Sequence, residues 1–143
     1  MHRLLVAILL FLCTVLMTAC GTIAEAGASV HTLAAVDTAK IERGIEVYRA
    51  NYCGACHTLD AANTRGTFGP DHNQAHALAI TNLSLDTYTG DAATVEDYLH
   101  ESIIAPTVFY TPGYEATNHH MPAFGHLPDD DIAALVYLLA QQR

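Results

Sequence analysis

The sequence contains no tryptophan and few aromatic residues, so a core built from its own side chains would be small. Aromatic residues make up 8% of its 143 residues, hydrophobic residues 51% and charged residues 15%. These proportions are typical of a folded chain rather than a disordered one. The length allows one domain at most. A small core of this kind is marginal unless a bound group fills part of it.

Basic residues are also scarce. Only 6 Lys and Arg residues stand against 15 Asp and Glu residues, and the formal net charge is -9. The few basic residues are scattered and build no positive stripe, which excludes DNA and RNA as partners. An acidic surface favours basic partner proteins instead.

The N-terminus carries an export signal. Arg3 precedes an uncharged apolar run from Leu4 to Met17, which has the length of a signal-peptide core rather than of a full membrane span. The segment Met17-Thr18-Ala19-Cys20 resembles a bacterial lipobox, in which the cysteine is lipidated and becomes the first residue of the mature chain. An uncleaved N-terminal anchor and an ordinary signal peptide are the alternatives. All three place the domain outside the cytoplasm.

The chain therefore divides into a lipoprotein signal peptide over 1–19, a flexible tether over 20–37 and a folded domain over 38–143. Apolar residues at helical spacing predict helices over 38–51, over 94–104 and from Pro128 to the C-terminus, with a short helix over 74–79. No alternating strand pattern persists. We expect an all-α fold whose long, Gly- and Pro-containing loops wrap around a bound group.

The segment Cys53-Gly54-Ala55-Cys56-His57 has the C-x-x-C-H pattern of c-type haem attachment. The two thiols add to the two vinyl groups of haem, and the histidine that follows ligates the iron. Gly54 and Ala55 are small and are expected to leave room for the porphyrin. The sequence therefore predicts one covalently bound haem c on Cys53 and Cys56, with His57 as an iron ligand.

Two other kinds of cysteine site fit less well. A thioredoxin-like pair requires a strand–loop–helix context, which the sequence does not show. A zinc site needs about four protein ligands. His119, His120 and His126 could complete one, but a histidine directly after the second cysteine is better explained by haem.

Met121 is the predicted distal ligand of the iron. It is the only methionine left once the signal peptide is removed, and Pro122 stiffens the loop that carries it. Gap-filling in the core is the other common role of a single methionine. His119 and His120 are alternative ligands, and ligation by two histidines would lower the reduction potential. The other histidines are interpreted as surface or hydrogen-bonding residues: His72, His76, His100 and His126.

The order of these features resembles the class I monohaem cytochromes c over residues 38–142. The resemblance rests on the haem motif, Gly69-Pro70, Met121-Pro122-Ala123-Phe124 and the acidic start of the last helix. It implies the class I fold, and it implies that the Pro70 carbonyl accepts a hydrogen bond from the proximal histidine.

The resemblance also implies that Gly44 and Tyr48 face the last helix near Leu135 and Tyr137. One segment departs from the family, because Asp71-His72-Asn73 replaces an apolar continuation.

The stretch from Tyr98 to Tyr114 is similar to haem domains attached to respiratory complexes, namely cytochrome subunits of terminal oxidases and the monohaem lipoprotein subunit of alternative complex III. This similarity implies membership of a membrane complex. Together with the haem motif and the lipobox-like segment, it leads us to expect a single-electron carrier held by lipidated Cys20 at the outer face of the cytoplasmic membrane. Its partners would be redox proteins of a respiratory or photosynthetic complex. The alternative is a haem enzyme, a peroxidase or gas-binding protein, whose distal ligand leaves the iron.

Overall fold

The computed structural model describes residues 35–116 and 118–143. The predicted signal peptide, Cys20 and most of the predicted tether lie outside the described residues. Within the described residues, no helix is long and apolar enough to cross a membrane.

The described part of the chain is helical with very little strand, which confirms the predicted all-α class. It contains helices α2 (Thr38–Ala50), α3 (Ala75–Leu83), α4 (Val95–Ile104) and α5 (Asp129–Ala140). Short 3-10 helices span Cys53–Ala55, Asp60–Ala62 and His72–Gln74. Two-residue strands β1 (Thr58–Leu59) and β2 (Thr64–Arg65) pair antiparallel, with Thr58 opposite Arg65.

Polar side chains define the helix ends. The Asp37 carboxylate accepts from the Lys40 amide at the start of α2. Thr94 and Asp97 form a reciprocal capping box before α4, as the sequence predicts. Three aspartates, Asp129–Asp131, occupy the first turn of α5, where negative charge suits the helix dipole.

Helix α3 differs most from its prediction. It begins one residue later than expected and continues four residues further, to Leu83. Polar residues concealed this continuation in the sequence. The Thr81 hydroxyl donates to the Ala77 carbonyl one turn back, and Asn82 is buried with its side-chain amide hydrogen-bonded. Both side chains thus have partners within the fold, and the helix continues through them.

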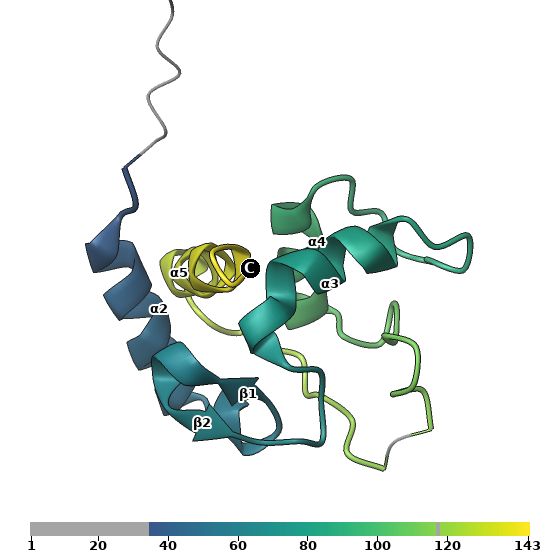
Figure 1. Cartoon of the computed structure of the whole chain (residues 1–143), viewed down its shortest axis with the longest axis horizontal. Coiled ribbons are helices and arrows are strands. Elements are labelled where there is room, and N and C mark those ends of the chain that lie inside the picture. Colours follow the sequence, from purple (N-terminus) through teal and green to yellow (C-terminus); the bar gives the residue numbers. More distant parts are fainter. Residues whose placement is uncertain (1–34, 117) are drawn as a thin grey trace, which may run out of the picture. The chain divides into compact units, whose positions relative to one another are not determined.

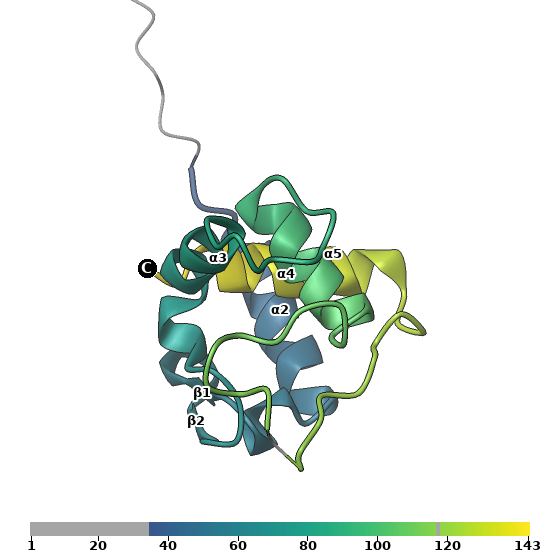
Figure 2. The same ribbon diagram turned by 90° about the vertical axis from the view of Figure 1, so that its right-hand side faces the viewer.

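Helix α5 is the centre of the packing, with α2 against one side and α4 against another (Figures 1 and 2). Gly44 lets α2 approach closely, because a Cβ atom there would lie 2.5 Å from the Ala134 carbonyl oxygen and 2.8 Å from the Leu138 Cβ. The close helix contact expected at Gly44 is present. The atoms nearest to such a Cβ belong to Ala134 and Leu138, next to the expected Leu135 and Tyr137, and the Tyr137 hydroxyl accepts from the Asp37 amide at the start of α2.

The long segment that connects the end of α4 to the start of α5 runs back along the domain (Figure 2). Its far end is fixed by a hydrogen bond from the Phe124 amide to the Ile103 carbonyl, at 3.0 Å. This segment, the loop after the second cysteine and the inner faces of α4 and α5 surround a cavity.

Candidate functional site

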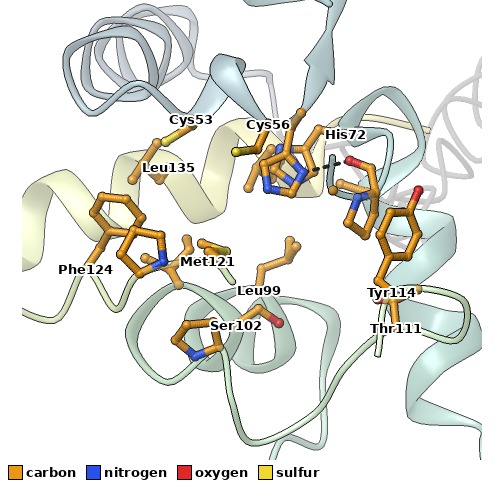
Figure 3. A pocket seen from close by; sticks show the side chains of 18 of the residues that line it. Cys53, Cys56, His72, Leu99, Ser102, Thr111, Tyr114, Met121, Phe124 and Leu135 are labelled. Carbon is orange, nitrogen blue, oxygen red and sulfur yellow. Dashed lines mark hydrogen bonds between the residues drawn. The ribbon is translucent and has the colours of Figure 1, made fainter. Parts of the chain in front are cut away.

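The cavity has a volume of about 310 Å³. Its walls come from segments far apart in the sequence, and Figure 3 shows Cys53, Cys56 and His72 facing Met121, Leu99 and Ser102 across an open space. Most lining atoms are apolar, and none of the lining residues is Asp, Glu, Lys or Arg. A cavity of this size and polarity is typical of a site for an organic cofactor.

A tight turn brings the two cysteines to one wall. Tyr52 adopts the left-handed conformation with φ of 56°, which ends the run of α2. The amides of Cys56 and His57 then both donate to the Cys53 carbonyl, at 3.2 and 3.1 Å. Both thiols are half-buried and neither forms a disulfide. Burial raises the pKa of Cys53 to about 11, so its thiol is protonated at neutral pH.

Gly54 lies against a neighbouring side chain. A Cβ atom at Gly54 would lie 2.1 Å from Cγ2 of Thr64. A side chain at position 54 would therefore overlap Thr64, which is a reason for glycine that the sequence interpretation did not give. Gly54 is required by the packing of β2 against the turn.

His57 is buried beside the cysteines, with 7% of its surface exposed. Its Nδ1 lies 2.8 Å from the Pro70 carbonyl oxygen and donates to it, which leaves Nε2 available to a metal. Burial lowers the pKa of His57, which keeps the ring in the neutral form that ligation requires. The hydrogen bond to Pro70 is the one that the family resemblance implies.

Gly69 makes this arrangement of the histidine possible. A Cβ atom at Gly69 would lie 2.3 Å from Cε1 and 2.7 Å from Nδ1 of His57. The Gly69 amide donates to the Cys56 carbonyl at 2.9 Å, which ties the loop to the haem motif. The sequence showed Gly69 only as part of a Gly-Pro pair, not as a residue that contacts the histidine.

Met121 is half-buried and lines the same cavity, on the wall opposite the cysteines in Figure 3. Of its two neighbouring histidines, His119 lines the cavity and His120 does not. The His119 ring stacks on Phe68 with centroids 4.2 Å apart. The alternative of a histidine as distal ligand thus has one candidate at the cavity, His119.

For zinc, the described residues contain no cluster of three or more His, Cys, Asp or Glu side chains that could hold a metal ion.

The sequence interpretation did not place His72 at the site. Its ring stacks on that of His57, with centroids 3.8 Å apart and an interplanar angle of 11°. Its Nδ1 lies 3.1 Å from the Tyr48 hydroxyl, so the hydrogen-bonding role is confirmed. The alternative surface role is wrong, because His72 lines the cavity. The only signal in the sequence was the missing apolar residue after Pro70.

A second polar group was also missed. The buried Asn82 amide donates to the Tyr98 hydroxyl at 2.8 Å and to the Thr111 hydroxyl at 3.0 Å. Both hydroxyl-bearing residues line the cavity. The partners are 16 and 29 residues from Asn82 in the chain, so no local pattern could reveal them.

These residues fit a covalently held haem. Two thiols share one wall, an imidazole nitrogen remains available beside them, and a thioether lies across an apolar cavity. The family model for cytochrome c matches residues 41–143. The chain belongs to the cytochrome c family. Comparison with curated proteins and with solved structures gave no match. The predicted class I cytochrome c fold and the single covalent haem c are confirmed by the family match.

The residues at the cavity of this cytochrome c have different roles toward the cofactor. Bound haem supplies one-electron chemistry between Fe(III) and Fe(II). Cys53 and Cys56 are placed to hold it, and the Pro70 carbonyl orients His57 and raises its basicity. The uncharged lining would disfavour the extra positive charge of a ferric haem and so raise its potential. The assignment of His57 and Met121 as the two iron ligands stays a prediction.

Proposed function

We propose that this cytochrome c is a single-electron carrier tethered through lipidated Cys20 to the outer face of the cytoplasmic membrane. There it serves a respiratory or photosynthetic electron-transfer complex as a subunit or close partner. The observation that carries the proposal is the pair of ligand side chains, His57 and Met121, on one cavity. With both axial positions filled, the iron exchanges electrons and binds no substrate. The lipobox-like segment Met17–Cys20 supports the tether.

The mouth of the cavity offers a route for electrons. Tyr52 and Phe68 line the cavity and are among the most exposed large hydrophobic residues, with 80% and 51% of their surface exposed. Tyr52 directly precedes Cys53, to which the haem edge would be attached, and Phe68 is part of the cavity wall. A partner would meet an apolar rim there, while the net charge of -9 would steer basic partners from a distance.

The tether adds a second contribution. Confinement to the membrane surface raises the effective concentration of membrane-bound partners without any new contact. Loss of the lipid can also be distinguished by experiment from loss of the haem, because Cys20 is separate in sequence from Cys53 and Cys56.

The proposal is tested by comparing the full chain with Cys20→Ser in an exporting host. Membranes are solubilised in mild detergent, separated on a native gel and stained for haem. We expect wild-type haem in the membrane fraction, in a band far larger than the 15.4 kDa chain. Cys20→Ser should keep its haem and appear in the soluble fraction.

Three results would count against parts of the proposal. Retention of Cys20→Ser in the membrane contradicts the lipid tether. A wild-type band at the size of the single chain contradicts a fixed subunit and leaves a tethered shuttle. Binding of carbon monoxide to the reduced protein at neutral pH, or turnover of peroxide, favours the haem-enzyme alternative over the electron carrier.

A further inference from the structure

The stack of His57 and His72 places a second imidazole directly against the proximal histidine. The centroids are 3.8 Å apart and the planes are inclined by 11°, so the rings overlap almost face to face. The hydrogen bond from His57 Nδ1 to the Pro70 carbonyl fixes one atom of the ring. A single hydrogen bond leaves rotation about its own direction open. A parallel ring at van der Waals distance restricts that rotation.

His72 is itself held in place. Its Nδ1 lies 3.1 Å from the hydroxyl of Tyr48, a residue of α2 with 1% of its surface exposed. The same hydroxyl lies 3.5 Å from the His57 carbonyl oxygen, which is long for an O–H···O bond, and it also contacts the Thr64 side chain. That carbonyl already accepts from the Thr64 hydroxyl at 3.0 Å. The hydrogen bond between the Tyr48 hydroxyl and His72 Nδ1 ties the His72 ring to helix α2.

We propose that His72 is a positioning residue for the proximal ligand: Tyr48 holds the His72 ring, which fixes the plane of the His57 imidazole and so tunes the reduction potential of the iron. The proposal rests on ligation of the haem iron by His57. It concerns a position where this chain carries a polar ring instead of the apolar residue expected after Gly69-Pro70. A polar ring beside the ligand stabilises the ferric charge more than an alkyl group does.

Four variants of the haem-loaded full chain test the proposal. His72→Leu removes both the flat ring and its polarity. His72→Phe keeps a flat ring without polarity, and Tyr48→Phe removes only the hydroxyl that holds His72. His76→Leu is the control, because His76 Nδ1 contacts the Ala140 carbonyl and its side chain does not line the cavity.

Two readouts separate positioning from packing. The first is the proton NMR shift pattern of the haem methyl groups in the ferric state, which depends on the planes of the axial ligands. The second is the Fe(II):Fe(III) ratio at a fixed potential and pH. Holoprotein with a wild-type far-UV spectrum is used for every variant.

We expect His72→Leu to change the methyl shift pattern and to raise the Fe(II):Fe(III) ratio about threefold, which corresponds to ~28 mV at 59 mV per tenfold change. His72→Phe should restore the shift pattern but keep the raised ratio. Tyr48→Phe should change the pattern in the same direction as His72→Leu, by less. His76→Leu should match wild type in both readouts.

A wild-type shift pattern and ratio in His72→Leu would overturn the proposal and leave His72 a packing residue. The same holds if Tyr48→Phe, which keeps the buried ring, matches wild type in both readouts. A haem-loaded wild-type protein whose NMR spectrum shows no iron-bound His57 imidazole would overturn the ligation by His57, and this inference with it. An intact wild-type spectrum with unaffected variants would overturn only the inference.

Discussion

At the scale of single residues, Gly69 leaves the proximal histidine the least room. We expect Gly69→Ala to displace the His57 ring, because the added Cβ would lie 2.3 Å from its Cε1. The displacement would lengthen the 2.8 Å hydrogen bond to Pro70 and cost about 1–3 kcal/mol of unfolding free energy. Urea unfolding of the holoprotein, with the haem content per chain, measures both effects.

Gly125→Ala is the matched control for Gly69→Ala. Gly125 lies in the loop after Met121, and the nearest atom to an added Cβ is the Ile104 Cβ at 3.7 Å, an ordinary contact. Its unfolding free energy should stay within about 0.5 kcal/mol of wild type. Equal effects of the two substitutions would mean that Gly69 does not confine the histidine.

Met121→His tests the distal ligand. Imidazole favours Fe(III) more than thioether does, so the reduction potential should fall. We expect the Fe(II):Fe(III) ratio at a fixed potential to drop at least tenfold, or ~59 mV, in a spectroelectrochemical titration. His120→Ala is the control, because His120 is exposed and does not line the cavity.

The opposite pattern would reassign the ligand. If Met121→His left the potential unchanged while His119→Ala or His120→Ala altered it, a histidine rather than Met121 would hold the distal position.

These residues also show which features of the site the sequence alone could predict. The haem motif is readable because thioether chemistry requires its cysteines and histidine within one turn of chain. Met121 could be predicted as the distal ligand because it is the only methionine outside the predicted signal peptide and because Pro122 follows it. His72 is not, because its role depends on a ring contact with His57 that crosses a folded loop. The contact that requires glycine at position 54 was missed for the same reason, since Thr64 approaches it from a neighbouring strand.

At the scale of helices, the crossing of α2 and α5 allows a prediction in which two effects oppose each other. Helix propensity alone would make Gly44→Ala stabilising by about 1 kcal/mol. The added Cβ, however, would lie 2.5 Å from the Ala134 carbonyl oxygen and 2.8 Å from the Leu138 Cβ. We expect the overlap to dominate and Gly44→Ala to lose about 1–3 kcal/mol in urea unfolding.

Glu42→Ala provides the control on the same helix. Glu42 is exposed, so its replacement tests the effect of alanine on α2 without the contact to α5. Its unfolding free energy should remain within about 0.5 kcal/mol of wild type. A gain in stability from Gly44→Ala would show that α2 shifts easily on α5.

The helices were more predictable than their contacts. Local signals such as the Thr94–Asp97 capping box and the acidic first turn of α5 placed the helix starts within a residue. The length of α3 was underestimated, because the partners that satisfy Asn82 lie on other segments. The individual residues of α5 that lie nearest Gly44, Ala134 and Leu138, could not be named from the sequence, since it gives a helix face more clearly than its register against another helix.

At the scale of the whole molecule, the cavity stands where a domain of this size would otherwise have its core. Helices α4 and α5 and the long loop between them line it rather than close over it. The buried apolar residues of the described chain form one cluster, and several of them, such as Leu99, Leu135 and Leu139, line this space. The absence of tryptophan and the small number of aromatic residues are explained by this arrangement, because the haem supplies the aromatic volume.

The energetic consequence can be estimated. The coefficient of about 24 cal/mol per Å³ applies to enclosed cavities, so an enclosed space of about 310 Å³ would cost about 7 kcal/mol, and this cavity, which is open on one side, costs less. A domain of this size has only about 5–15 kcal/mol of stability in total. Haem would cover the apolar lining of this cavity, so we expect the apoprotein to lose fixed tertiary packing.

The variant Cys53→Ala/Cys56→Ala, purified without haem, tests this dependence. We expect it to keep part of its far-UV signal, to lose its near-UV signal and to show no cooperative urea transition, as in a molten globule. Cys20→Ser is the control, since it removes a thiol but keeps both thioether positions. It should unfold at the wild-type midpoint. A cooperative transition of the haem-free variant near that midpoint would show that the loops collapse into the cavity and that the chain folds without its cofactor.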